Sequence, residues 1–210
     1  MKETQNIELL TSSYDFTLPS ELIASHPANP RDHAKLLVYD RKSDAITHAR
    51  FYDLEKFIPH GCALIFNDTK VIKARLFGFK PSGGKIELLI NRPLNATDVN
   101  VYMRGKVKVN SIVAFDENLI AQVKELNEDG SRVVNFLTHD KVLRFEEVLP
   151  IIDKIGHIPL PPYIQREDNK EDASEYQSVF AREEGAVAAP TASLHFTREQ
   201  HAHICQNYEH

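Results

Sequence analysis

Cysteine is scarce in this sequence: its 210 residues include only Cys62 and Cys205. Two cysteines so far apart build no disulfide framework and are typical of a protein kept in a reducing compartment, so we expect a cytoplasmic protein. The chain also lacks any run of about 18 apolar residues that could cross a bilayer. Its opening residues, MKETQNIELL, lack the apolar segment of a signal peptide. We therefore expect neither a signal peptide nor a membrane partner.

An excess of positive charge is missing as well. The chain has 25 Lys and Arg against 30 Asp and Glu, for a net charge of −5. This balance argues against a protein that coats nucleic acid unselectively, although it is compatible with a local basic face. The hydrophobic share of 42% is ordinary for a globular protein. The length allows one large domain or two small ones, and the sequence contains no internal repeat.

The first third of the chain alternates between helical and extended patterns. A continuous apolar run that ends in polar residues is typical of a buried strand with a functional site at its carboxyl end. The expected elements are a short helix over 18–27, a hairpin of 35–40 with 44–51, a short helix over 53–59 and a buried strand over 62–68.

Short segments of alternating polarity then follow, separated by turn residues such as PSGG and NEDG. Six strands at such close spacing predict a small antiparallel barrel. They are expected at 71–80, 85–91, 99–109, 111–115, 118–126 and 132–137, before a helix within 140–156. The fold class predicted is α/β, a mixed sheet with helices, carrying an inserted β-barrel. The barrel is assigned to 69–138 and the discontinuous α/β domain to 1–68 plus 139–210.

Basic residues recur on the expected barrel strands. Alternate residues of a strand share a face, so Arg104, Lys106 and Lys108 would lie beside Tyr102, and Lys73 would lie beside Arg75. Such a face could hold a phosphate backbone, and a solvated barrel surface explains the pattern too.

Other candidate residues each have a structural alternative. Asn67 and Asp68 end the expected buried strand, where ligands often bind, or they form an Asx-turn. Tyr163 and Arg166 follow three prolines, whose stiff backbone could aim them at a base and a phosphate or merely connect domains.

The segment EEGAVAAPTASLHFT, residues 183–197, combines small residues with a single histidine. Small side chains permit close approach of a flat ligand, while hydroxyls and an imidazole supply polar contacts. A buried packing segment is the alternative. The acidic segment 167–177 is expected to be exposed, and Thr197 with Gln200 forms a capping-box pattern. His201 and Cys205 are too few for a zinc site, so no metal is expected.

Five blocks in order, spread over about residues 14–197, carry a resemblance to a known family. They are NPRDHAKLLVYDR, LIFNDTKVIKARLFG, IPLPPYIQR, EYQSVFARE and GAVAAPTASLHFT. Together they closely resemble the S-adenosylmethionine:tRNA ribosyltransferase-isomerase family of queuosine biosynthesis. The resemblance implies an α/β domain with an inserted barrel. It also implies that S-adenosylmethionine is a consumed ribosyl donor, with no true cofactor. The implied partner is a tRNA that carries 7-aminomethyl-7-deazaguanine at the wobble position, and the implied products are epoxyqueuosine, adenine and methionine.

This chemistry assigns roles to the candidate residues. A base must remove a C5′ proton made acidic by the sulfonium, and an acid or donor must assist adenine's departure. His195 is the candidate for either role, and Asp68 or Glu87 could orient the amine or offset the sulfonium charge. Substrate-binding candidates are Asn67, Tyr163, Tyr176, Gln177, Thr191 and Ser193. The tRNA-binding candidates are Arg31, Lys73, Arg75, Arg104, Lys106, Lys108 and Arg166, and Arg31, Arg75 or Arg166 could instead hold the methionine carboxylate.

Members of this family continue well past the HFT motif, which here lies near the end of the sequence. We therefore expect little or no ribosyl transfer by the 210-residue chain alone, as a possible monomer. The competing hypothesis is a tRNA-binding barrel module without catalysis, which would not bind S-adenosylmethionine. A hydrolase built on Ser193 and His195 is disfavoured, because no nucleophile elbow accompanies them.

Overall fold

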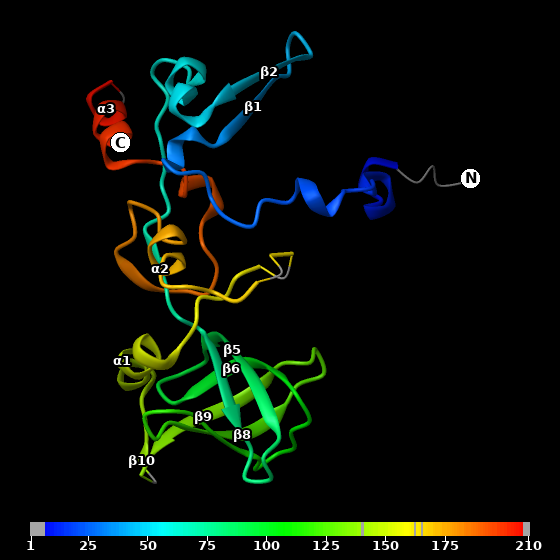
Figure 1. Ribbon diagram of the computed structural model, residues 1–210, viewed down its shortest axis with the longest axis vertical. Helices are drawn as coiled ribbons and strands as arrows, with labels where there is room; N and C mark the ends of the chain where they lie inside the picture. The colour runs from blue at the N-terminus through cyan, green and yellow to red at the C-terminus, as the bar shows by residue number, and fades with distance from the viewer. Residues whose placement is uncertain (1–6, 140, 162, 165, 208–210) are drawn as a thin grey trace.

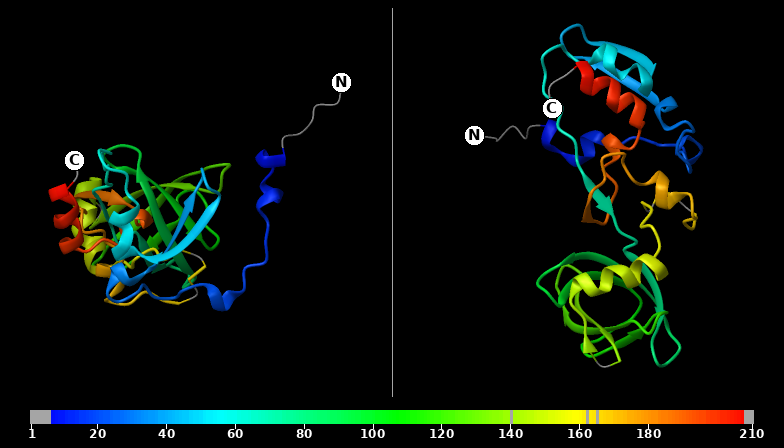
Figure 2. Two further views of the ribbon diagram at one scale, coloured as in Figure 1. Left: turned by 90° about the horizontal axis from the view of Figure 1, so that it is seen from above. Right: turned by 90° about the vertical axis from the view of Figure 1, so that its left-hand side faces the viewer.

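The computed structural model describes residues 7–207, except 140, 162 and 165. The molecule is elongated, with a barrel at one end and a hairpin at the other (Figure 1). Helix α2 (Asp172–Glu175) lies between them, and the first described residues form an arm to one side. The right-hand view of Figure 2 shows the same separation of barrel and hairpin.

Six antiparallel strands form the closed barrel that the sequence predicts. They are β4 (Arg75–Phe79), β5 (Lys85–Pro93), β6 (Asp98–Arg104), β7 (Ile112–Ala114), β8 (Ile120–Leu126) and β9 (Arg132–Thr138). Their order is β9-β6-β5-β4-β7-β8, and a β9–β8 pairing closes the ring. The PSGG turn between β4 and β5 uses Gly83 at a φ of +80°, a conformation that glycine adopts without strain.

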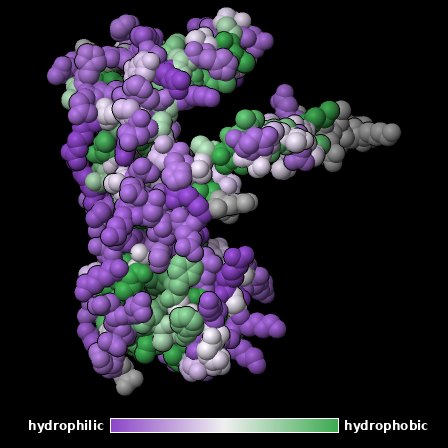
Figure 3. Space-filling model, viewed as in Figure 1, coloured by the Kyte–Doolittle hydropathy of each residue, from purple (hydrophilic) through white to green (hydrophobic). Residues whose placement is uncertain are grey.

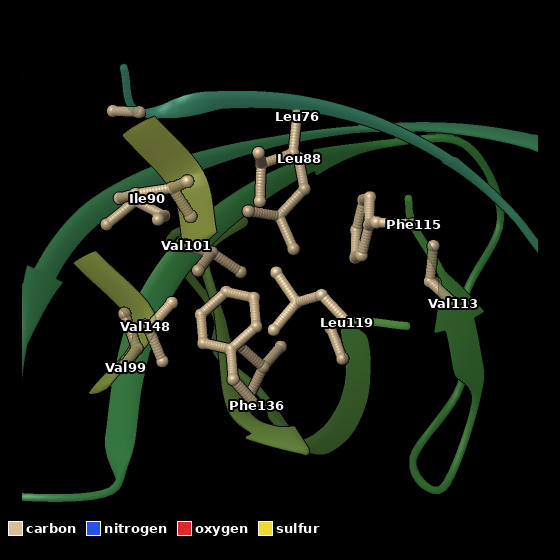
Figure 4. Packing of buried hydrophobic residues seen from close by; sticks show 14 of the residues in the cluster. Leu76, Leu88, Ile90, Val99, Val101, Val113, Phe115, Leu119, Phe136 and Val148 are labelled. Atoms are coloured by element: carbon tan, nitrogen blue, oxygen red, sulfur yellow. The ribbon is translucent and has the colours of Figure 1, made fainter. Parts of the chain in front are cut away.

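Alternation along these strands directs one set of apolar side chains into the barrel. Leu76, Leu88, Val101 and Phe136 are fully buried there (Figure 4). The strand pair β10 (Lys141–Val142) and β9 leads into α1 (Phe145–Ile155), whose Val148 joins the same cluster. The cluster thus extends past the expected 69–138 range, and the predicted domain limits stay a prediction.

The remaining chain forms a second body, which we call the smaller body because its hydrophobic core is the smaller of the two. Strands β1 (Lys35–Asp40) and β2 (Ala45–Arg50) make the expected hairpin, and β3 (Thr69–Val71) pairs in parallel with β11 (Glu183–Ala186). Phe51, Phe180, Phe196 and Ile204 form its core. The other helical elements are η1 (Ile7–Leu9), η2 (Thr11–Tyr14), η3 (Ser20–Leu22), η4 (Arg31–His33), η5 (Phe51–Phe57), η6 (Thr191–Ser193) and α3 (Arg198–Asn207). The predicted fold class, an α/β body of mixed sheets and helices with an inserted barrel, is confirmed.

The expected buried strand over 62–68 is wrong. No described segment pairs with it as a neighbouring strand, and a strand requires a hydrogen-bonded partner. Cys62, Leu64 and Phe66 pack on the second core, whereas Ile65 on the opposite side is 95% exposed. The continuous apolar run therefore covers one face only.

The helix expected over 18–27 is also wrong, because only the single 3₁₀ turn η3 forms there. Short helices depend on packing of an apolar face, and Leu22 is largely exposed. The helix expected over 53–59 is a 3₁₀-helix at Phe51–Phe57. The acidic segment 167–177 is not wholly exposed, since Asp172 is fully buried.

Among the described residues, no helix is long and apolar enough to span a bilayer.

Candidate functional site

A cavity of about 340 Å³ lies in the smaller body, and we name it the central pocket. Four separate segments line it, so its shape depends on long-range contacts rather than on one local motif. The lining residues are Ala24, Ser25, His26, Pro27, Ala28, Asn29, Arg31, Pro161, Tyr163, Ile164, Glu175, Tyr176, Thr191, Leu194 and His195.

The central pocket collects five residues that the sequence nominates for substrate or catalysis. They are Arg31, Tyr163, Tyr176, Thr191 and His195. These residues are up to 164 positions apart in the chain, from 31 to 195, so their convergence is a property of the fold. Aromatic rings, an imidazole and a guanidinium suit a flat, polar ligand of nucleoside size.

A buried ion pair holds one of the segments that line the pocket. Arg166 donates from Nη1 and Nη2 to the two carboxylate oxygens of Asp172, at 2.6 and 2.7 Å. Its Nε donates to the carbonyl of Ser25 at 2.9 Å, which ties the 24–29 loop to α2. The hydrogen bond from Arg166 is the main reason that the pKa of Asp172 lies below its usual range. Arg166 is thus engaged inside the protein, in contrast to its predicted contact with tRNA.

Arg31 provides the second tie between the same two segments. Its Nη1 donates to the carbonyl of Gln177 at 3.0 Å and its Nη2 to that of Ser174 at 3.2 Å. Two of its five N–H groups are accounted for by these bonds, and the side chain still lines the pocket. The two hydrogen bonds therefore fix the position of the Arg31 guanidinium, and its positive charge lies beside the pocket.

His195 is held half-buried against the ring of Phe51, with ring centroids 5.2 Å apart. Burial lowers the pKa of His195 below the ordinary histidine value, and the positive charge of Arg31 lowers it further. The imidazole is accordingly neutral at pH 7, which leaves one ring nitrogen able to accept a proton.

Two tyrosines give the pocket its aromatic surface. Tyr163 is 56% exposed, whereas Tyr176 is half-buried. The pKa of the Tyr176 phenol is raised, chiefly by burial, so the hydroxyl remains protonated and can donate a hydrogen bond. Tyr163 therefore has part of its ring open to an incoming flat ligand.

Several nominated residues lie outside the central pocket. Asn67 accepts hydrogen bonds from the amide and the hydroxyl of Thr69, which is the Asx-turn alternative. The backbone carbonyl of Asp68 accepts hydrogen bonds from the backbone amides of Arg182 and Glu183, and Asp68 is an exposed residue.

Two further nominated residues hold the backbone together. The side-chain amide of Gln177 bonds both the N–H and the carbonyl of Val71, at 2.9 and 2.7 Å, and so replaces a strand neighbour. The hydroxyl of Ser193, in a buried residue, donates to the carbonyl of Pro190 at 3.0 Å. Neither residue lines the pocket.

The basic barrel residues do not form the single face expected over 99–109. Strand β6 ends at Arg104, and Gly105 has a φ of +122°, so Lys106 and Lys108 lie in a loop rather than on the strand. Alternation therefore no longer applies to them, which corrects the prediction.

The other nominated barrel side chains form ion pairs. Glu87 lies 3.2 Å from Nε of Arg75 and 3.8 Å from Nη1 of Arg104, and Lys73 lies 3.3 Å from Asp153. Glu87 belongs to a barrel hollow and is not part of the central pocket.

His26 and Glu175 are pocket residues that the sequence reasoning missed. The available signal was SHPANP, residues 25–30, in which two prolines stiffen a loop around a histidine. A helix was predicted over 18–27, so this loop was not recognised from the sequence.

Metal ligation finds no support in the part of the chain that the structure describes, where no group of three or more His, Cys, Asp or Glu side chains converges. His201 and Cys205 do meet on α3, with Nε2 and Sγ 3.0 Å apart. Two ligands alone do not make a zinc site.

The fold and the pocket define an α/β protein that carries a six-stranded barrel and a cavity suited to a flat polar ligand. The family model described as "Queuosine biosynthesis protein" matches residues 11–208. The chain therefore belongs to the queuosine biosynthesis protein family.

The relatives carry one common name, S-adenosylmethionine:tRNA ribosyltransferase-isomerase. The protein of that name from Sulfurimonas denitrificans is 73% identical over 97% of this chain and 59% of its own length. The one from Nitratiruptor sp. is 59% identical over 91% of this chain and 56% of its own length. A solved S-adenosylmethionine tRNA ribosyltransferase from Thermotoga maritima is 27% identical, covers 93% of this chain and 55% of that one, and has a TM-score of 0.35. This chain thus spans less than two thirds of the length of these relatives.

Proposed function

We propose that the central pocket binds S-adenosylmethionine as a ribosyl donor for the modification of tRNA. The acceptor is 7-aminomethyl-7-deazaguanine in the tRNA, and the products are epoxyqueuosine-tRNA, adenine and methionine. The observation that carries this proposal is the convergence of Arg31, Tyr163, Tyr176, Thr191 and His195 on one cavity. The name of the relatives supports S-adenosylmethionine and tRNA as the substrates and a ribosyl transfer with isomerisation as the type of reaction.

In this proposal His195 is the base that removes a C5′ proton of the sulfonium substrate. A neutral imidazole is required for that step, and the lowered pKa of His195 provides it at pH 7. The role of proton donor to adenine is less compatible with this residue, because a lowered pKa leaves little imidazolium present. Tyr176, whose raised pKa keeps its hydroxyl protonated at pH 7, is the proposed hydrogen-bond donor to a ring nitrogen.

The other pocket residues would bind the donor. Tyr163 would stack on the adenine, and Glu175 would offset the positive sulfonium. The Arg31 guanidinium would attract the methionine carboxylate through its remaining donors. S-adenosylmethionine is consumed in this scheme, so no further cofactor is needed. We place the protein in the cytoplasm as a monomer, and we expect the 210-residue chain alone to bind the donor but to carry out little or no ribosyl transfer.

Calorimetric titration of the 210-residue chain with S-adenosylmethionine tests the proposal. We expect saturable binding that Tyr163→Ala weakens by roughly three- to tenfold. Tyr52→Ala is the matched control, because Tyr52 is similarly exposed (49%) and lies outside the pocket. If Tyr163→Ala bound S-adenosylmethionine with unchanged affinity, the central pocket would not be the binding site. Binding of RNA without any binding of S-adenosylmethionine would favour a tRNA-binding module without catalysis.

A further inference from the structure

Three aromatic rings stand on the outer surface of the barrel, away from the central pocket. Phe77 and Phe79 on β4 are 53% and 52% exposed, and Tyr102 on β6 is 44% exposed. Strand β5 runs between these two strands and pairs with both. We name the surface formed by Phe77, Phe79 and Tyr102 the aromatic face. A hydrophobic patch is visible on the barrel side that faces the viewer (Figure 3).

The barrel core does not explain these rings. Leu76 and Gly78, the neighbours of Phe77 on β4, are the residues buried on the inner side. A side chain at position 78 would collide with Phe115 at 2.6 Å, so the interior is already filled there. Phe77 and Phe79 instead border a hollow of about 440 Å³ on the outside. Two neighbouring phenyl rings with about half their surface in water indicate a contact surface.

Two basic residues lie beside the aromatic face. Strand register places Lys85 opposite Phe79 and Glu87 opposite Phe77, and Arg104 on β6 is opposite Glu87. Among the described residues that line the hollow, Lys85 and Arg104 are basic and Glu87 is acidic. The side chain of Arg104 is 89% exposed and lies 3.8 Å from Glu87. Such a loose pair leaves the guanidinium able to bind a phosphate.

A histidine of fixed orientation borders the same face. The His157 ring meets Phe77 edge-on, with centroids 5.1 Å apart, and its Nδ1 lies 2.8 Å from a carboxylate oxygen of Asp168. The contact with the Asp168 carboxylate fixes the orientation of the ring, and Nε2 lies on the other side of it. A ring nitrogen beside stacked bases can hydrogen-bond the 2′-hydroxyl of a ribose, which is both a donor and an acceptor.

We propose that the aromatic face binds unpaired nucleobases of an RNA by stacking, while Arg104 and Lys85 neutralise the adjacent phosphates. This inference rests on the proposed function, which supplies a tRNA substrate, and it names the surface that receives an unpaired segment of that substrate. Exposed rings between cations are how single-stranded nucleic acid is bound without sequence readout. Bases within a duplex are already stacked on one another, so the face selects loops over helices.

Fluorescence anisotropy with a labelled anticodon stem-loop and a labelled RNA duplex tests this proposal on the full 210-residue chain. We expect tighter binding to the stem-loop, and a loss on the order of tenfold or more when Phe77 and Phe79 are both changed to alanine. The matched control is Phe16→Ala, because Phe16 is 77% exposed and does not line the hollow beside the aromatic face. Thermal melting of each variant verifies that the barrel remains folded.

The salt dependence of binding separates stacking from phosphate contacts. Arg104→Ala should reduce the slope of log affinity against log salt by about one, whereas the double phenylalanine variant should lower affinity at unchanged slope. Equal binding of stem-loop and duplex, or an unchanged affinity of the double variant, overturns the inference. If the double phenylalanine variant lost self-association in gel filtration but kept its RNA binding, the aromatic face would be the contact surface for a second copy of the chain. That result would also overturn the inference.

The same variants distinguish this inference from the proposed function. Phe77→Ala with Phe79→Ala should leave S-adenosylmethionine binding unchanged, since neither residue lines the central pocket. RNA binding that survives this change, together with intact S-adenosylmethionine binding, would refute the aromatic face alone. Absence of binding to both ligands would refute the proposed function as well.

Discussion

The barrel and the smaller body are stabilised in different ways. The larger hydrophobic cluster, in the barrel and α1, joins eighteen buried residues, whereas the cluster of the smaller body joins four. The smaller body relies instead on hydrogen bonds between distant segments, such as the Arg166–Asp172 pair and the Gln177–Val71 contacts. Apolar burial is spread over many atoms, while each of these polar contacts depends on a single side chain.

This difference has a functional meaning. The barrel presents a surface on a sheet wall, because hydrogen-bonded neighbouring strands hold the aromatic face in place. The central pocket exists only while its four segments stay together. Substitutions in the barrel should therefore act on global stability, and substitutions in the smaller body should act on pocket shape.

The largest expected effect is removal of core volume from the barrel. Phe136 is fully buried in the larger cluster, so Phe136→Ala should lower the free energy of unfolding by about 3–5 kcal/mol. Phe79→Ala, on the outer side of the same barrel, is the control and should change it by less than about 0.5 kcal/mol. Urea unfolding followed by circular dichroism measures both. Equal losses would contradict the assignment of the two rings to inside and outside.

The next effect comes from the buried ion pair. Asp172→Ala leaves the Arg166 guanidinium without its partner, which should cost about 3 kcal/mol in the smaller body. Asp153→Ala is the control, because its side chain is 80% exposed. Hydrogen exchange in the 24–29 loop is the measurement, and we expect faster exchange there with unchanged protection in β5. Unchanged exchange in the loop would show that Arg166 does not position it.

The pH dependence of the same pair follows from the pKa of Asp172, which lies below its usual range in the fold. A carboxyl with a lowered pKa contributes stability above its unfolded pKa of about 3.9 and loses it as pH falls through the folded value. Exchange in the 24–29 loop should therefore accelerate below about pH 4. In the Asp172→Ala variant, exchange in this loop should depend less on pH. If the variant and the unsubstituted chain showed the same pH dependence, the Asp172 carboxyl would not be its source.

Sequence patterns predicted the barrel well because its information is local. Alternation in KIELLIN and RVVNFL, with turns between, specifies both the strands and their inner faces. Strand β6 was expected to run to residue 109, although Gly105 ends it after Arg104. A glycine inside an alternating run is the signal for such an end.

The pocket was harder to predict because its contacts connect distant positions. His195 and Tyr163 were singled out by their local surroundings, a small-residue segment and three prolines, and the resemblance to a family supplied their expected roles. The role of Arg166 was missed, since the sequence does not show that its partner is the buried Asp172. Gln177 was nominated for substrate, yet both ends of its amide bind Val71, a contact that spans 106 positions.

Gln177 should therefore have a structural effect of intermediate size. Its amide satisfies the N–H and the carbonyl of Val71, a buried residue, so Gln177→Ala should cost about 1–3 kcal/mol. Gln206→Ala on α3 is the control, because Gln206 is exposed. Exchange of the Val71 amide measures the local loss. If Gln177→Ala abolished S-adenosylmethionine binding without altering that exchange, the predicted substrate contact would be restored.

The smallest expected effect concerns the surface pair on the same two-stranded sheet. Lys70 and Glu184 join β3 to β11 at 2.8 Å, but each side chain is 46% exposed, so water and salt screen the attraction. The hydrogen bond from Lys70 to Glu184 raises the pKa of the lysine, and its contribution is lost as pH rises above about 10. Lys70→Met should cost less than about 1 kcal/mol, and 1 M salt should remove the difference. A loss as large as that of Gln177→Ala, or one unaffected by salt, would show that the β3–β11 pairing depends on its surface charges rather than on the amide beneath them.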